Sequence, residues 1–179
     1  MVYLYLADGF EEVEAMTAVD YLRRAGIDCK LVSMTGERLV RGTHDIRIET
    51  DLLFEDADHS KCEMMILPGG IPGAVNLDRH KDFGKRLLDA NKSGTPISAI
   101  CAAPMVLGHL GILKGKKATI YPGMEHNLKG AIHVEEKVIH DGNIITSQGP
   151  ATAVYFALEI IRTLKGAETA EELASDILL

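Results

Sequence analysis

The sequence predicts an α/β protein, a three-layer sandwich in which a mostly parallel sheet carries helices on both faces. A continuous apolar run at residues 2–7 and largely apolar segments at 63–67 and 95–100 are typical of strands buried on both faces. Segments with helical periodicity alternate with these runs, and the connections between them are short. No repeat or linker interrupts the 179 residues, so we expect a single domain spanning residues 1–179.

The first helix is predicted over residues 11–25, directly after the first strand. Its apolar side chains recur at the spacing of one helical face: Val13, Met16, Val19 and Leu22. Acidic residues in the first turn and arginines in the last suit the helix dipole, and Gly26 is typical of a C-terminal cap. Residues 28–33 predict the second strand, and residues 39–50 predict two short β segments at the sheet edge.

In the middle of the chain, residues 76–91 contain a predicted helix. Its inward-facing residues are expected to be Phe83, Leu87 and Leu88. The apolar strand at 95–100 leads into a helix predicted over 102–110, and a short strand is predicted at 118–121.

The C-terminal third begins with a hairpin. Apolar pairs at 138–139 and 144–145 flank the turn residues 140–143. A helix follows over 150–165, opened by a proline whose missing N–H costs nothing in a first turn. Its apolar stripe comprises Val154, Ala157, Leu158, Ile161 and Leu164. Residues 167–178 predict a short terminal helix.

The composition argues against nucleic-acid binding, a membrane span and secretion. A net charge of -7 argues against a duplex nucleic-acid binder, and 5% aromatic residues without Trp disfavour a stacking platform for single strands. No apolar run reaches the length of a membrane span, and the N-terminus lacks the basic flank of a signal peptide. Three cysteines without a secretion signal predict free thiols, so we expect a cytoplasmic protein.

Ligand sites in parallel sheets lie at the carboxyl ends of the strands, which directs attention to residues 8–14, 67–73 and 100–104. At the last of these, an apolar strand runs into Cys101 and a helix follows at once, the layout of a nucleophile elbow. A helix start favours thiolate and is expected to lower the pKa of Cys101. A small buried cysteine filling a tight corner fits the residues equally well.

The other two junctions offer partners for that sulfur. The N–H groups of Gly69 and Gly70 can form an oxyanion or anion pocket, although a plain tight turn explains the glycines too. Glu14 lies beside Val13 at the edge of the predicted buried face. A carboxyl there has a raised pKa and can donate or relay a proton, whereas the alternative is a solvated helix glutamate.

The remaining cysteines and histidines carry weaker signals. Cys29 and Cys62 lie at strand starts, away from the predicted site, and are interpreted as structural. The seven histidines are scattered without the spacing of a metal site, so no metal is expected. His126, a few residues after the strand end at Tyr121, is the one with a possible accessory role. No serine elbow motif occurs.

Five segments in register resemble the ThiJ/PfpI (DJ-one) superfamily, nearest to the branch of the human parkinsonism-associated protein and bacterial YajL. They are residues 9–14 (GFEEVE), 23–26 (RRAG), 67–70 (LPGG), 99–104 (AICAAP) and 146–150 (TSQGP). The resemblance implies a flavodoxin-like sandwich and a homodimer. It also implies a nucleophilic, easily oxidised Cys101, with Glu14 beside its sulfur and an oxyanion pocket of Gly69, Gly70 and Ala102.

Two functions are implied by the resemblance. One is cofactor-independent processing of reactive α-oxoaldehydes, as in glyoxalase III and deglycase enzymes, with a small aldehyde as substrate. The other is oxidative-stress sensing and redox-regulated chaperone activity through oxidation of Cys101. A binding module without chemistry is the third alternative, but the acidic segment after the first strand would repel the phosphate of a flavin. No cofactor is therefore expected.

Three positions depart from the family pattern. Protease-like members carry His directly after the cysteine, and Ala102 at that position argues against peptidase or amidotransferase-like activity. Tyr121 stands where the human-like branch has a histidine, and His44 stands where that branch has an arginine near an anion site. Tyr121, His126 and His44 are therefore the candidate accessory residues.

Overall fold

The computed structural model describes residues 1–179 and contains a seven-stranded sheet in the order β10-β11-β7-β6-β1-β2-β5. Neighbouring strands are parallel except for the antiparallel pair β10 and β11. The strands are Val2–Leu6 (β1), Cys29–Ser33 (β2), Leu52–Leu53 (β5), Met64–Leu67 (β6), Ile97–Ile100 (β7), Val138–Asp141 (β10) and Ile144–Ser147 (β11). The predicted mostly parallel sheet and C-terminal hairpin are confirmed.

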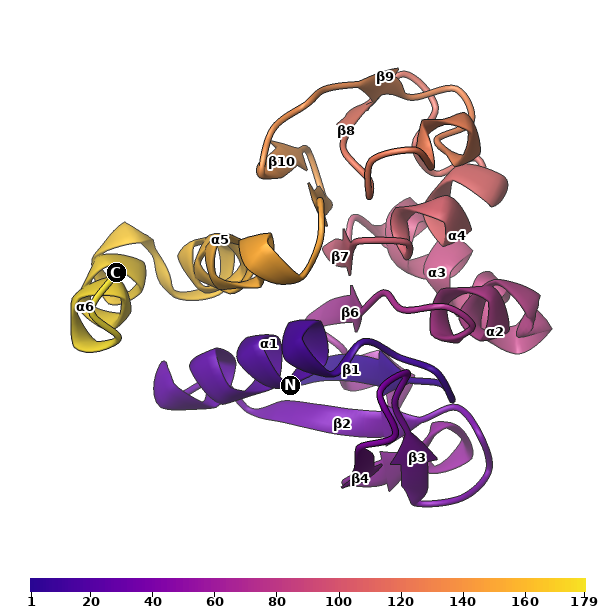
Figure 1. Ribbon diagram of the computed structural model, residues 1–179, viewed down its shortest axis with the longest axis horizontal. Helices are drawn as coiled ribbons and strands as arrows, with labels where there is room; N and C mark the ends of the chain where they lie inside the picture. Colours follow the sequence, from indigo (N-terminus) through magenta and orange to yellow (C-terminus); the bar gives the residue numbers. More distant parts are fainter.

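Helices cover both faces of this sheet, as predicted. They are Glu12–Arg24 (α1), Gly73–Arg79 (α2), Lys81–Ser93 (α3), Pro104–His109 (α4), Ala153–Lys165 (α5) and Ala167–Asp176 (α6). On one side α5 packs against α1 and α6, and on the other α2 contacts α3 and α4 (Figure 1). None of the six combines the length and the apolar character that crossing a bilayer requires.

Two small sheets and four 3-10 turns complete the chain. The segments β3 (Leu39–Arg41) and β4 (Arg47–Glu49) form an antiparallel hairpin, in agreement with the two short segments predicted there. The segments β8 (Lys117–Ala118) and β9 (Ile132–His133) pair in parallel outside the main sheet, so the strand predicted at 118–121 is largely wrong. The 3-10 turns are Phe54–Asp56, His59–Lys61, Glu125–Asn127 and Pro150–Thr152.

The core is built on the three central strands. Every residue of β1, β6 and β7 is buried, because helices cover both faces of the sheet at these positions. This explains why their sequences are continuous apolar runs rather than alternating ones. The cluster is aliphatic apart from a few rings, among which Tyr3, Tyr5 and Phe83 are fully buried.

Two predicted core positions are wrong. Val13 is 53% exposed, whereas its neighbours Glu12 and Glu14 are buried. Their carboxylates accept hydrogen bonds from backbone N–H groups of neighbouring loops, those of His44 and Gly69. Leu88 is 44% exposed. Leu87 occupies the buried face of α3, and the next residue lies about 100° further around a helix.

Candidate active site

The predicted site lies at a topological switch point of the sheet. From β1 the chain proceeds to β2 on one side, and it later returns to place β6 and then β7 on the other side. Connections that depart in opposite directions leave a crevice at the carboxyl ends of the two strands, here β1 and β6. The segments that follow β1, β6 and β7 therefore meet, and they carry Glu14 in the first turn of α1, Gly70 and Cys101 respectively.

Cys101 is held in the conformation of a nucleophile elbow. Its φ is 61°, a left-handed value that costs a non-glycine residue on the order of 1–3 kcal/mol. Two backbone hydrogen bonds maintain it, from Cys101 N to the carbonyl oxygen of Ser147 and from Tyr121 N to that of Cys101, each 2.9 Å. The helix begins at Pro104 rather than at 102, so the cysteine lies on a tight turn before α4. Its side chain is buried, with the residue 8% exposed.

Glu14 is fully buried beside this elbow. Its Oε2 accepts a hydrogen bond from Gly69 N at 2.8 Å, and its own N–H donates to Glu11 Oε2 at 2.7 Å. Its Oε1 is buried without a hydrogen-bond partner. A Cβ added to Gly69 would lie 2.6 Å from Cys101 Cβ and 2.8 Å from Glu14 Oε2, so both side chains border the same small space.

The N–H groups of Gly69 and Gly70 have different roles beside Cys101 and Glu14. Gly69 N–H donates to Glu14 Oε2, so it holds the carboxyl in place, and its predicted role in an oxyanion pocket stays a prediction. Gly70 and Ala102 are instead the residues whose backbone N–H groups favour the anionic form of Cys101 by lowering its pKa. Gly70 has a φ of 89°, and a side chain there would overlap the carbonyl oxygen of Gly9, so only glycine fits this turn.

Burial dominates the electrostatics of the pair. Burial, and next the charge of Glu14, raise the pKa of Cys101 to about 12, while the N–H groups of Gly70 and Ala102 oppose the shift. Burial likewise raises the pKa of Glu14 to about 7. The predicted lowering of the cysteine pKa by a helix start is therefore wrong for a thiol beside an ionised Glu14. The two groups titrate as a unit that holds one proton over a wide pH range.

A model of the DJ-1/PfpI family matches residues 1–163 of the chain. The chain belongs to the DJ-1/PfpI family. This DJ-1/PfpI chain is 39% identical over 176 residues to the protein dj-1beta of Drosophila melanogaster, covering 97% of this chain and 94% of that protein. The match confirms the resemblance read from the sequence motifs.

Other relatives extend the comparison. The solved structure of oxidized DJ-1 from Toxoplasma gondii superposes with a TM-score of 0.94 at 32% identity, covering 99% of this chain and 97% of that one. This likeness confirms the flavodoxin-like fold. A protein named as a deglycase in Pyrococcus abyssi is 29% identical over 168 residues, covering 92% of this chain and 99% of that protein.

The accessory residues of this DJ-1/PfpI chain fall in different places. Tyr121 adjoins Cys101 through its backbone, and its half-exposed ring packs over Gly149. His126 lies exposed on the turn Glu125–Asn127, and its ring hydrogen-bonds with Asn127. Neither ring hydrogen-bonds with Cys101 or Glu14.

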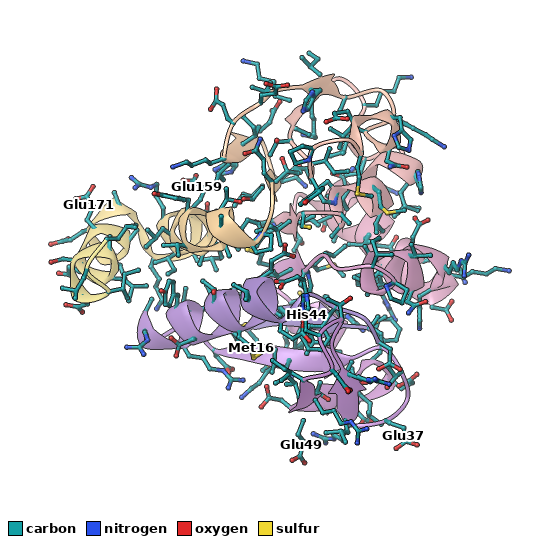
Figure 2. All side chains as sticks on the ribbon, viewed as in Figure 1. Met16, Glu37, His44, Glu49, Glu159 and Glu171 are labelled. Carbon is teal, nitrogen blue, oxygen red and sulfur yellow. The ribbon has the colours of Figure 1, made fainter.

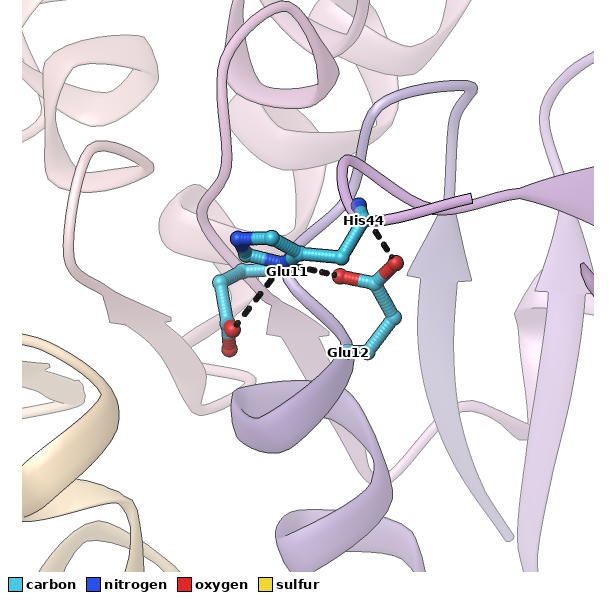
Figure 3. A group of neighbouring side chains, drawn as sticks. All are labelled: Glu11, Glu12 and His44. Carbon is cyan, nitrogen blue, oxygen red and sulfur yellow. Dashed lines mark hydrogen bonds and ion pairs between the residues drawn. The ribbon is translucent and has the colours of Figure 1, made fainter. Parts of the chain in front are cut away.

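His44 lies with two acidic residues whose role the sequence reading missed. Figure 3 shows its ring between Glu11 and Glu12, with Nδ1 2.9 Å from Glu12 Oε2 and 4.0 Å from Glu11 Oε1. Burial alone would raise the pKa of Glu12, but hydrogen bonds from the side chain and backbone of His44 hold it below its ordinary value. The signal for this cluster was three acidic residues within four positions, Glu11, Glu12 and Glu14. The sequence analysis explained the acidic residues of the first turn by the helix dipole and did not consider a partner for them.

The same cluster is the one group in the chain that could hold a metal ion. Its donor atoms lie within 4.8 Å of one another. Hydrogen bonds already occupy several of these carboxylate oxygens, because Glu12 accepts from His44 and Glu11 accepts from the backbone N–H of Glu14 as the cap of α1. The other two cysteines are poor nucleophiles: burial raises the pKa of Cys29 to about 12 and that of Cys62 to about 11.

Proposed function

We propose that the protein processes reactive α-oxoaldehydes without a cofactor, with Cys101 as nucleophile and Glu14 as proton carrier. One observation carries this proposal: a fully buried carboxyl with an unpartnered oxygen borders a cysteine on a strained elbow. A carboxyl in that position holds a proton at neutral pH and can exchange it with the sulfur. The deglycase name of the Pyrococcus relative points to the same substrate class.

The first step forms a hemithioacetal. When the shared proton of the pair is on Glu14, the Cys101 thiolate attacks the aldehyde carbon and the carbonyl electrons move to oxygen. The N–H groups of Gly70 and Ala102, which favour the anionic form of Cys101, stabilise the developing oxyanion. Glu14 then donates its proton to that oxygen and becomes a carboxylate.

The second step moves hydrogen between two carbons. The Glu14 carboxylate removes the proton of the former aldehyde carbon, and the electron pair shifts to the adjacent carbonyl to give an enediolate. Glu14 returns that proton to the adjacent carbon, and the hydroxyl proton of the first carbon passes to the oxygen of the second, which leaves a 2-hydroxyacyl thioester on Cys101. One carbon is oxidised while its neighbour is reduced, so the rearrangement needs no external oxidant, and water finally releases the 2-hydroxy acid.

Methylglyoxal provides the test. We expect the purified protein to convert it to lactate without added glutathione, and Cys101→Ala and Glu14→Gln to abolish the conversion. Cys62→Ser is the matched control, because its hydroxyl can keep the hydrogen bond that the thiol donates to the Met64 carbonyl oxygen. Wild-type turnover no faster than that of Cys101→Ala would exclude this function.

A redox-sensing role is the second candidate, favoured by the N–H groups of Gly70 and Ala102. Two backbone donors that favour the anionic form of Cys101 can hydrogen-bond to the oxygens of a sulfinate, the product of mild peroxide oxidation. We expect peptide mass spectrometry to find added oxygen at Cys101 before Cys29 or Cys62. The opposite order would exclude sensing through Cys101. Chaperone activity and the homodimer that the resemblance implies stay predictions.

A further inference from the structure

Glu11 and Glu12 carry two buried carboxyl groups that share a single basic neighbour. The side chain of Glu11 is 9% exposed and that of Glu12 is 5% exposed. No lysine or arginine forms an ion pair with either of them, so the His44 ring is the only basic group beside the two acids. Buried carboxylates are usually paired with a cation or coordinate a metal ion. These surroundings are therefore those of a cation site.

The oxygens that lie beside the ring are the ones that no backbone group holds. Glu11 Oε2 accepts from the N–H of Glu14 at 2.7 Å, and Glu12 Oε1 accepts from the N–H of His44 at 2.7 Å. The other oxygen of each carboxylate lies near His44 Nδ1, that of Glu12 at 2.9 Å and that of Glu11, which accepts no hydrogen bond, at 4.0 Å (Figure 3). Hydrogen bonds to the outer oxygens orient such ligands toward a shared centre.

The His44 ring can offer a nitrogen lone pair to the same centre. Nδ1 carries the proton of the neutral ring while it lies against Glu12 Oε2, because a carboxylate can only accept. Nε2 has no partner in the chain, and the side chain is 68% exposed, so the proton can reside on Nε2 instead. Nδ1 then becomes a ligand without any change in the charge of the ring.

We propose that Glu11 Oε1, Glu12 Oε2 and His44 Nδ1 bind a divalent transition-metal ion, with Zn²⁺ as the ion that fits best. Carboxylate oxygens and imidazole nitrogens are ordinary Zn²⁺ ligands, and three protein ligands leave a fourth position for water. Mg²⁺ favours oxygen ligands alone. The inference goes beyond the proposed function, because no step at Cys101 involves the ion. Spacing along the sequence could not reveal the set, since Glu12 and His44 are 32 positions apart.

A bound ion would join two segments that are distant in the chain. His44 lies on the turn between β3 and β4, and the glutamates lie at the start of α1 (Figure 2). The neighbouring Thr43 already donates from N to the carbonyl oxygen of Phe10 at 2.8 Å and from Oγ1 to that of Ile71 at 2.9 Å. The ligands meet only in the folded protein, so Zn²⁺ at about 100 times its Kd should raise Tm by about 5–10 °C.

Calorimetric titration of Zn²⁺ into the purified protein tests the site. We expect one ion per chain in the wild-type protein, and an affinity lower by about 10-fold or more in His44→Gln and in Glu11→Gln. Both variants should fold, because His44 is exposed and a glutamine at position 11 keeps an oxygen for the N–H of Glu14. Neither variant should show the full rise in Tm, and Mg²⁺ should not displace Zn²⁺ from the wild-type protein.

His140→Gln and Cys101→Ala are the matched controls, and both should bind Zn²⁺ like the wild-type protein. Nδ1 of His140 also pairs with a glutamate, Glu159, at 2.8 Å, but the two belong to no group of three possible ligands. An affinity of His44→Gln within twofold of wild type would overturn the site. Loss of the ion in Cys101→Ala would overturn it too, by assigning the ion to the thiol, as would a wild-type protein that binds no Zn²⁺. Lactate formation tests the proposed function separately.

Discussion

The shared proton of Glu14 and Cys101 can be tested directly by replacing Glu14 with Gln. In the wild-type protein the pair loses its first proton near pH 7, set by the Glu14 pKa of about 7. One negative charge and one proton then remain for two groups. The proposed mechanism requires that this anion be held mainly as thiolate and carboxylic acid. Cys101 should then react with iodoacetamide with a midpoint close to pH 7.

The amide of the Glu14→Gln variant cannot exchange that proton. The sulfur must then ionise alone, and because burial is the main cause of its raised pKa, its midpoint should be at or above the ordinary ~8.5 of a free cysteine. At pH 7 about half of the wild-type pairs are ionised, against at most about 3% of the variant thiols. We therefore expect the alkylation rate at pH 7 to fall about 15-fold or more.

The assay is the alkylation rate between pH 5 and 9, followed by mass spectrometry. The other thiols stay silent in this range: with pKa values of about 12 for Cys29 and about 11 for Cys62, roughly 1% or less is ionised at pH 9. Cys101→Ser supplies the blank. A wild-type midpoint at pH 9 or above, or a midpoint that Glu14→Gln does not move, would refute proton sharing.

Three further predictions concern stability and packing. The pKa of Glu14 rises from 4.5 in the unfolded chain to about 7 in the folded protein, so between these pH values the folded state binds more protons than the unfolded state. The free energy of unfolding should therefore fall by about 3 kcal/mol as pH rises through this window. In urea titrations Glu14→Gln should remove this dependence on pH, and an unchanged dependence would contradict the raised pKa. Gly69→Ala should cost about 1–3 kcal/mol and abolish methylglyoxal turnover, because its Cβ would meet both Cys101 and Glu14; full activity with an unchanged Tm would contradict that crowding. Leu87→Ala should cost about 2–5 kcal/mol and Leu88→Ala under about 0.5, since only the first is buried; equal losses would contradict the orientation of α3.

Local sequence was sufficient to predict most of the fold. Helices on both faces bury β1, β6 and β7, whose residues are apolar apart from Ser98, and that pattern is visible without any tertiary information. The position of Cys101 was predictable for the same reason, because a strand followed at once by small residues predicts an elbow. Hydrophobic periodicity gave the wrong prediction in the first turn of α1. It predicts that Val13 is buried, but Val13 is exposed and its neighbours Glu12 and Glu14 are buried.

The sequence by itself determined the fold class, the family and the position of the candidate nucleophile. Only the tertiary structure decided what surrounds that nucleophile, because the neighbours of Cys101 come from loops far away in the chain. It showed that Gly69 N–H donates to Glu14, and that Glu12 hydrogen-bonds with His44 across 32 positions of sequence. Burial, which raises the pKa of both Glu14 and Cys101, is a property of the packed molecule and leaves no mark in local sequence.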